Sequence, residues 1–157
     1  DMSVGENLSM KKYRTEELSH NTVMNKGRIR HFAEALIERF TIKTPSQDTS
    51  VKFLSGGNIQ KTILAREIDF CRGILIAVYP SRGLDVGATE AVRQNLIKQR
   101  DGGAAVLLVS EELEELLMVA DKIAVMFEGR IMDTVQANKT TIEELGMLMA
   151  GVAREGR

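Results

Sequence analysis

The side chains and backbone best suited to chemistry in this chain are those of Ser55, Gly56 and Gly57, in the string 54–58 (Leu-Ser-Gly-Gly-Asn). Residues 59–67 are rich in helix-forming side chains, so the two glycines fall at the start of a helix. The first amides of a helix have no intrahelical acceptor and lie at the positive end of its dipole. Glycine lets an anion approach such amides closely, and the Ser55 hydroxyl would add a donor. The string therefore predicts a phosphate-binding helix start, although two glycines alone could form an ordinary turn or cap.

Three further segments, residues 80–88, 109–113 and 125–130, follow the string in order. Together they resemble the motifs of ABC-type ATPases, and the string 54–58 resembles the signature loop of that family. The likeness is closest to the second ATP-binding half of double-domain importers for simple sugars and nucleosides. In that half the signature ends in Asn, here Asn58, and an Arg-Gly-Leu-Asp-Val-Gly-Ala run follows the core strand. The resemblance covers nearly the whole chain and implies an α/β fold of the P-loop NTPase type.

A phosphate loop of the form Gly-x4-Gly-Lys-Ser/Thr is absent from the sequence, which contains no Gly-Lys pair. Such a loop wraps the phosphates with backbone amides and adds a neutralising lysine. The resemblance places that loop before the signature, and this chain begins at Asp1 without an initiating Met. We therefore expect a partial ABC ATPase fold that lacks the phosphate-loop strand, the back part of a second and degenerate nucleotide-binding domain.

Composition favours an intracellular globular piece with one modest core. The chain has 157 residues, 43% of them hydrophobic, a net charge of −1 and one cysteine, so it can form no internal disulfide. No apolar run approaches the roughly 20 residues that cross a bilayer, and no signal-peptide pattern begins the chain. The near-neutral charge argues against a nucleic-acid partner. His20, His31 and Cys71 have no partners at ligand spacing, so no metal site is predicted.

Residues 1–53 are expected to be mostly helical. From residue 27 to residue 40, apolar side chains recur at helical spacing and form one wide stripe: Ile29, Phe32, Ala33, Leu36, Ile37 and Phe40. The resemblance makes residues 1–53 a helical subdomain whose outer groove receives a coupling helix of a membrane permease. The alternative is that the stripe serves only the chain's own core. Residues 11–14 form a small basic cluster that is expected to be a solvated loop, and residues 44–48 form a linker by turn chemistry.

Residues 54–157 are expected to hold the signature loop and a partial core sheet. Two short apolar runs, 74–79 and 104–109, are typical of buried parallel strands and flank a helix at about 87–100. Residues 123–127 and 130–134 predict a hairpin, and the order of strands and helices implies an α/β layer. Thr140 and Thr141 stand three residues before Glu143 and Glu144 and predict a last helix to about residue 150.

The catalytic positions depart from those of an active ATPase. Where the resembling family ends its core strand in Asp-Glu before Pro, this chain has Val78 and Tyr79, which can neither ligate magnesium nor act as a base at neutral pH. The position of the switch histidine is occupied by Glu111, whose charge would repel a γ-phosphate. The simpler interpretation of that residue is a solvated acidic first turn of a helix, made by Glu111, Glu112, Glu114 and Glu115. No catalytic residue is predicted.

In the resembling family each ATP lies between the phosphate loop of one domain and the signature loop of the other. Ser55, Gly56 and Gly57 would then bind the γ-phosphate of an ATP held by the front half of the same polypeptide, with Mg²⁺ held only through that partner domain. Asn58 would support the loop, and Asp85 would cross the dimer seam. The alternative for Asp85 is an N-terminal cap of the helix that follows it.

The parent protein is expected to drive ATP-dependent import of a simple sugar or nucleoside. It would be cytoplasmic and peripheral to the inner face of the cell membrane through permease subunits, with a solute-binding protein as an indirect partner. The alternative is a catalytically inactive interaction module that shapes the permease interface without contacting nucleotide. A DNA-repair relative would need a long coiled coil and basic faces, which the sequence lacks. Without the phosphate-loop strand, the strand 104–109 would have an open edge, so the chain is expected to self-associate.

Overall fold

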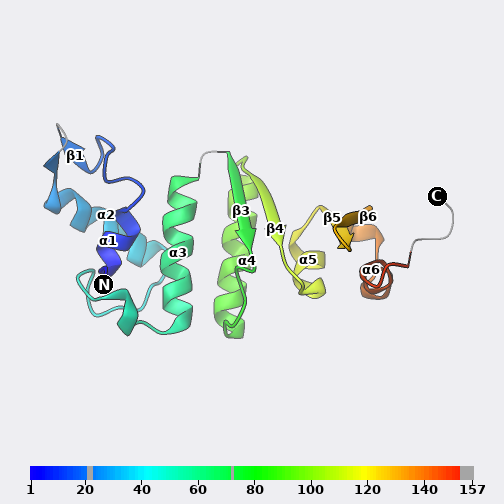
Figure 1. The fold of residues 1–157 in the computed structure, drawn as a ribbon. Helices are drawn as coiled ribbons and strands as arrows, with labels where there is room; N and C mark the ends of the chain where they lie inside the picture. Colours follow the sequence, from blue (N-terminus) through cyan, green and yellow to red (C-terminus); the bar gives the residue numbers. More distant parts are fainter. Residues whose placement is uncertain (21–22, 72, 153–157) are drawn as a thin grey trace. The chain divides into compact units, whose positions relative to one another are not determined.

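The structure, a computed structural model, describes residues 1–20, 23–71 and 73–152. Its α-helices are α1 (Val4–Ser9), α2 (Lys26–Arg39), α3 (Gly56–Phe70), α4 (Val86–Asp101), α5 (Leu113–Val119) and α6 (Ile142–Met149) (Figure 1). Its strands are β1 (Ser19–His20), β2 (Val23–Met24), β3 (Ile74–Val78), β4 (Ala105–Val109), β5 (Lys122–Phe127) and β6 (Arg130–Gln136), and 3-10 helices occupy Val51–Phe53 (η1) and Ala137–Lys139 (η2). The chain forms two compact units: a first unit of Asp1–Leu75 and Pro80–Val106, and a second unit of Ile76–Tyr79 and Leu107–Arg157.

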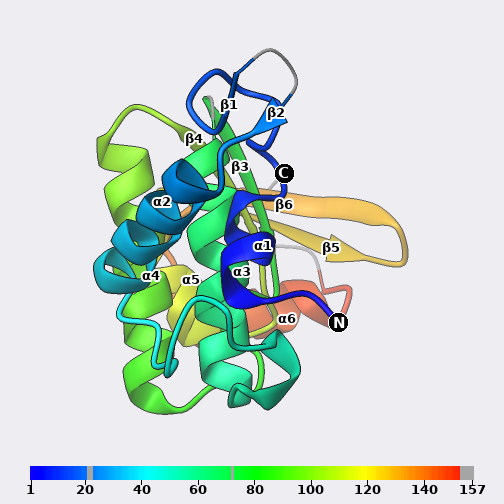
Figure 2. The same cartoon turned by 90° about the vertical axis from the view of Figure 1, so that its left-hand side faces the viewer.

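In the first unit, α1 packs against both α2 and α3 (Figure 2). The apolar stripe predicted for residues 27–40 is confirmed: it forms the inner face of α2, where Ala33 and Leu36 are buried, and it ends in the buried ring of Phe40. Residues 1–53 contain more loop than predicted, because among the described residues of this range only α1, α2 and η1 are helical, and two antiparallel two-residue strands lie between α1 and α2.

The helices α3 and α4 lie side by side in the same unit (Figure 1). Each presents a buried stripe at helical spacing: Thr62, Leu64, Ala65 and Ile68 on α3, and Ala88, Val92 and Leu96 on α4. The start of α4 is one residue earlier than the sequence predicted, because Asp85 caps it.

The strands β3 and β4 pair in a two-stranded sheet. The Ala105 N–H donates to the Gly73 carbonyl at one end and the Tyr79 N–H to the Val109 carbonyl at the other, both at 2.8 Å, so the strands are parallel as predicted. The strand β5 pairs antiparallel with β6 in a separate two-stranded sheet, so the third predicted strand does not extend the first sheet.

The second unit has its own core, built from β5, β6, η2 and α6. Its buried members are Ile123, Val125, Val135, Ala137, Leu145 and Leu148. The predicted capping box is confirmed at one of its two candidate positions: Thr141 caps α6 and Glu144 returns the bond to the cap backbone. The hairpin turns at Glu128 and Gly129, as the sequence predicted, and both have positive φ, the conformation of a type I′ turn.

The C-terminus of α2 ends in a Schellman motif. The Thr41 N–H donates to the Glu38 carbonyl at 3.0 Å, and the Ile42 N–H donates to the Ile37 carbonyl at 2.9 Å. Thr41 lies at the left-handed position of this motif with φ 52°, where glycine is usual and a β-branched residue is strained. The buried side chain of Ile42 holds the motif in place.

Replacing Thr41 by Gly should raise the free energy of unfolding by about 1 kcal/mol, because the left-handed conformation costs glycine little. Thr41→Ala is the matched control, since it removes the β-branch but keeps a Cβ. Urea unfolding of the three proteins would measure the difference, and a Gly variant no more stable than the Ala variant would contradict the strain.

Candidate phosphate-binding site

The string 54–58 forms a helix start, as the sequence predicted. Ser55 is the N-cap of α3 with extended backbone (φ −65°, ψ 156°), and its carbonyl accepts the N–H groups of Asn58 and Ile59 at 2.9 Å. Within the described part of the chain, the amides of Gly56 and Gly57 donate to no acceptor. The Ser55 side chain makes no capping bond to α3. The first turn of α3 thus has donors that the fold does not use.

The side chain of Asn58 fixes the orientation of the Ser55 hydroxyl. Asn58 Oδ1 accepts the backbone N–H of Lys43 at 2.8 Å, and because a backbone N–H can only donate, the amide nitrogen of Asn58 must face the other way. That nitrogen donates to Ser55 Oγ at 2.9 Å. Ser55 therefore accepts a hydrogen bond from Asn58 and keeps its own proton for an acceptor elsewhere.

The two glycines have different surroundings. A Cβ placed on Gly56 would meet nothing within 4 Å, so this exposed residue borders open space. A Cβ on Gly57 would lie 3.8 Å from the Cβ of Ala88, an ordinary contact, so the first turns of α3 and α4 lie against each other. Close packing therefore does not require glycine at Gly56, the first residue of α3, and alanine is the better helix former.

The segment 80–88 reaches the same pair of helix starts. Asp85 Oδ1 accepts the Ala88 N–H at 2.8 Å, so Asp85 is the N-cap of α4. This cap is the alternative interpretation that the sequence offered for Asp85. Gln60, one turn into α3, donates from Nε2 to the Pro80 carbonyl at 2.7 Å. Sequence reasoning did not single out Gln60, whose role depends on a carbonyl twenty residues away.

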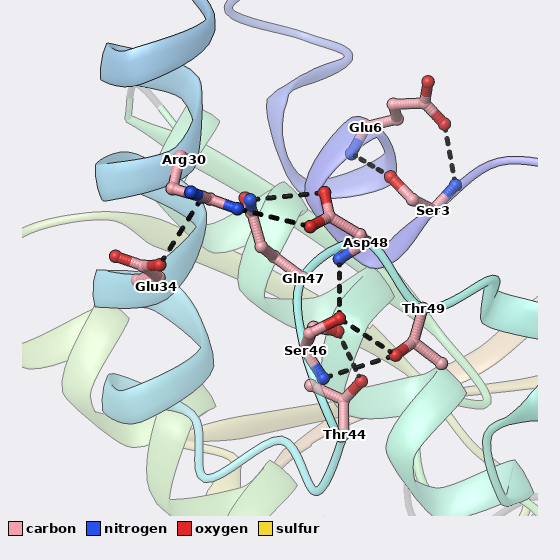
Figure 3. Close-up of polar contacts among 9 residues, drawn as sticks. All are labelled: Ser3, Glu6, Arg30, Glu34, Thr44, Ser46, Gln47, Asp48 and Thr49. Atoms are coloured by element: carbon pink, nitrogen blue, oxygen red, sulfur yellow. Dashed lines mark hydrogen bonds and ion pairs between the residues drawn. The ribbon is translucent and has the colours of Figure 1, made fainter.

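The linker at residues 44–48 is an ordered turn (Figure 3). Ser46 Oγ accepts the Asp48 N–H at 3.2 Å, and Arg30 of α2 lies 3.4 Å from an Asp48 carboxylate oxygen. The N–H of Val4 donates to the carbonyl of Thr49, just after the turn, at 2.9 Å, and the N–H of Gly5 donates to the carbonyl of Gln47 at 2.8 Å. The chain that leads into the string 54–58 is therefore held by both α1 and α2.

The last turn of α3 is held by charge pairs. Lys12 Nζ lies 2.6 Å from Asp69 Oδ2, and Lys11 forms a hydrogen-bonded ion pair with Glu67. The expectation that residues 11–14 form a solvated loop is wrong for Lys12, whose side chain is only 18% exposed. The reason is that acidic residues at 67 and 69 lie opposite the cluster, which the sequence alone does not reveal.

These ion pairs shift the pKa values of Lys12 and Glu67. Burial by itself would lower the pKa of Lys12, but its hydrogen bonds to Asp69 and Glu17 outweigh burial and raise that pKa. Burial by itself would raise the pKa of Glu67, but hydrogen bonds from Lys11 and Arg66 outweigh it and lower that pKa.

The residues at the positions where the resemblance would place catalytic groups lie together at the carboxyl ends of β3 and β4. Tyr79 follows β3 and its N–H bonds to Val109, the last residue of β4, so Tyr79 and Glu111 belong to one edge of the sheet. Glu111 is exposed, but Glu115 is fully buried and accepts the Ser110 hydroxyl at 2.8 Å. The expectation that Glu115 faces water is therefore wrong, because Ser110 gives its carboxylate a buried partner.

Other kinds of site are not evident in the part of the chain that the structure describes. It contains no group of three or more His, Cys, Asp or Glu side chains placed to hold a metal ion. None of its described helices has both the length and the apolar character of a membrane span.

Comparison with known proteins identifies relatives over almost the whole chain, although no family model matches it. The chain is 49% identical over 151 residues to the guanosine import ATP-binding protein NupO of Bacillus subtilis (strain 168). It is 43% identical over 151 residues to the nucleoside import ATP-binding protein NupA of Lactococcus lactis subsp. cremoris (strain MG1363). Each alignment covers 96% of this chain and 30% of the relative, so the chain spans about three tenths of the length of these curated relatives.

Solved structures share the fold at low sequence identity. A dimeric ATP-binding cassette in a post-hydrolysis state, bound to ADP and Pi, has a TM-score of 0.71 at 21% identity, over 87% of this chain and 57% of that one. A metal-chelate type ABC transporter in an inward-facing conformation has a TM-score of 0.75 at 16% identity, over 96% of this chain and 59% of that one. These likenesses confirm the predicted α/β fold as part of an ATP-binding cassette.

The pairing of Glu67 predicts a dependence of stability on pH. Its lowered pKa contributes stability that is present above the ordinary value of 4.5 and is lost as the pH falls through the folded-state value. Between about pH 5 and about pH 3, the free energy of unfolding should therefore fall less steeply in Glu67→Gln than in the wild type. Urea unfolding across that range would measure it, with the exposed Glu114→Gln as control; equal slopes in wild type and Glu67→Gln would contradict the pairing.

Proposed function

Because the chain has the sequence and fold of part of an ABC transporter ATP-binding protein of the nucleoside and sugar importer type, we propose that residues 55–58 complete an ATP site whose phosphate loop belongs to another domain. The observation that carries this proposal is the start of α3. Two glycine amides without acceptors and a serine hydroxyl with its proton free lie beside open space, in a chain that has no Gly-Lys pair. Such a group of donors suits a phosphate and has no other use in the described fold.

In this proposal the chain acts on the γ-phosphate by hydrogen bonding alone. The amides of Gly56 and Gly57 and the hydroxyl of Ser55 donate to its oxygens, and the dipole of α3 adds favourable charge. Asn58 keeps the Ser55 hydroxyl turned so that its proton can be donated. Asp85, through its second carboxylate oxygen, crosses the dimer seam while its first caps α4.

The remaining parts of the reaction belong to the partner domain, the front half of the same polypeptide. That domain holds the phosphates and Mg²⁺ and activates water, because Val78, Tyr79 and Glu111 cannot do so here. The chain by itself is therefore expected to have no ATPase activity.

The parent protein, by this proposal, drives import of a nucleoside or simple sugar. Residues 1–53 face permease subunits, which hold the protein at the cytoplasmic face of the cell membrane, and a solute-binding protein delivers the solute to them. The choice of a nucleoside as solute is supported by the names of two relatives, NupO and NupA, which are 49% and 43% identical to this chain.

A second candidate is an interaction module that shapes the permease interface without contacting nucleotide. This candidate is favoured by Val78, Tyr79 and Glu111, which replace the catalytic side chains expected of an active ATPase. Gly56 opposes it, because a scaffold would gain stability from alanine at this open helical position.

Bulk or negative charge at the start of α3 should abolish ATP hydrolysis by the intact ATPase that carries this chain. Ser55→Arg and Gly56→Asp each place a group where the phosphate would lie, so we expect turnover to fall at least about a hundredfold, the loss typical of removed transition-state donors. Steady-state hydrolysis at saturating ATP would measure it.

Two variants control this experiment. Gly146→Asp adds the same carboxylate to an exposed helical glycine of α6 with nothing within 4 Å, and it should leave turnover unchanged. Glu111→Gln should also have little effect. Full activity in Gly56→Asp would rule out the proposed site and favour the interaction module.

We also propose that the open edge of β4 recruits another chain. Among the described residues β4 pairs only with β3, and the apolar side chains Ile76, Val78, Leu107 and Val109 of these strands are between 40% and 63% exposed. Unpaired apolar edges of this kind add strands from other molecules.

Leu107→Lys should therefore reduce self-association of the isolated chain, because a charge on an edge strand opposes strand addition. Met147→Lys, at a similarly exposed apolar position of α6 (53% against 56% for Leu107), is the control and should associate like the wild type. Light scattering as a function of concentration would separate them. A strictly monomeric wild type, or equal loss in both variants, would contradict association through β4.

A further inference from the structure

The side chain of Gln60 joins the two segments that the proposed function places at the nucleotide. It lies on α3 one turn after Gly56, and its Nε2 donates to the Pro80 carbonyl at 2.7 Å, while Pro80 is buried. Both residues belong to the first unit. The bond connects the helix of the signature loop to the beginning of the segment that contains Asp85.

Two further contacts continue this connection along the same faces. Gly57 lies three residues before Gln60, on the side of α3 where a Cβ would touch Ala88 of α4. The N–H of Ala88 is itself bonded to Asp85, and the N–H of Leu84 donates to the Ser81 carbonyl at 3.1 Å. From Pro80 to Ala88, the segment is therefore tied at both ends to the first two turns of α3.

The segment needs such a tie because its start is strained. Tyr79, the residue before Pro80, has φ 48°, although a residue that precedes proline prefers extended backbone and a non-glycine residue disfavours positive φ. A strained residue persists only where its surroundings hold it. The hydrogen bond from Gln60 holds the carbonyl of Pro80, the residue that follows Tyr79.

We propose that Gln60 is a positioning residue that makes the start of α3 and the segment 80–85 move as one body, so that Ser55, Gly56, Gly57 and Asp85 reach a nucleotide in a single fixed arrangement. This inference rests on the proposed function, since it assigns Gln60 a role at that same site. The arrangement matters in the transition state, where all donors must be in place together, more than in the binding of ATP, which the partner domain's phosphate loop carries.

The test uses variants of Gln60 in the intact ATPase. Gln60→Met keeps the length of the side chain but cannot donate, and we expect kcat to fall about fivefold, the effect of one neutral hydrogen bond, with KM for ATP unchanged. Gln60→Lys restores a donor and should restore most of kcat. The control is Gln94→Met on α4, where Nε2 donates to the exposed Glu90 carboxylate at 2.8 Å, and it should leave kcat and KM unchanged.

A second readout does not depend on activity. In the chain itself, amide hydrogen exchange at Leu84 and Ala88 should be about fivefold faster in Gln60→Met than in the wild type, and unchanged in Gln94→Met. A wild-type kcat in Gln60→Met, or a loss that Gln60→Lys fails to restore, would overturn the inference. If Ser55→Arg is also fully active, the proposed function itself has failed; if Ser55→Arg is inactive while Gln60→Met is not, only the role of Gln60 has failed.

Discussion

The backbone amides of Gly56 and Gly57 at the start of α3 find no acceptor among the described residues, and contacts across the first unit fix where these amides lie. A helix start normally satisfies its first amides with a side chain, and Ser55 is a residue type that could do so. Here Ser55 Oγ makes no capping bond and instead accepts a hydrogen bond from Asn58, whose own orientation is fixed by the Lys43 N–H. The unsatisfied donors are thus a built feature of the loop.

The rest of the first unit keeps this loop in place from both sides. The turn at residues 44–49 is held by α1 and α2, and the last turn of α3 is held through Lys12 and Asp69. Most of these contacts join residues distant in sequence. The position of the loop therefore depends on the fold of the unit, and a short peptide with the same string would not reproduce it.

The elements of the fold could be predicted from the sequence, because their signals are local. The apolar runs that became β3 and β4, the period of α2 and the Thr141–Glu144 box each lie within a few residues. The errors concern long-range pairing. Glu115 was expected in water because charge at a helix start is usually solvated, and only the structure shows that Ser110 meets it in the interior. The partners of Lys12 and Gln60 were hidden for the same reason.

The first unit offers hydrogen-bond donors for a phosphate, whereas the second unit lacks the side chains that would catalyse ATP hydrolysis. At the carboxyl edge of β3 and β4 lie an aliphatic side chain, a phenol and an exposed carboxylate, at the positions where the family resemblance would place magnesium ligands, a base and a switch histidine. On the proposed function, the chain supplies the part of an ATP site that donates hydrogen bonds, and another domain supplies the part that performs the reaction. A site shared with another domain would explain this asymmetry.

The most direct test of a shared site is the response of the Gly56 and Gly57 amides to nucleotide, measured by nuclear magnetic resonance on labelled chain. The chain would be titrated with ATP alone, with the proposed partner domain, the front half of the polypeptide, alone, and with both under conditions that prevent hydrolysis. The account predicts that the two amide resonances shift only when ATP and the front half are present together. Shifts with ATP alone, or no shift with both, would contradict it.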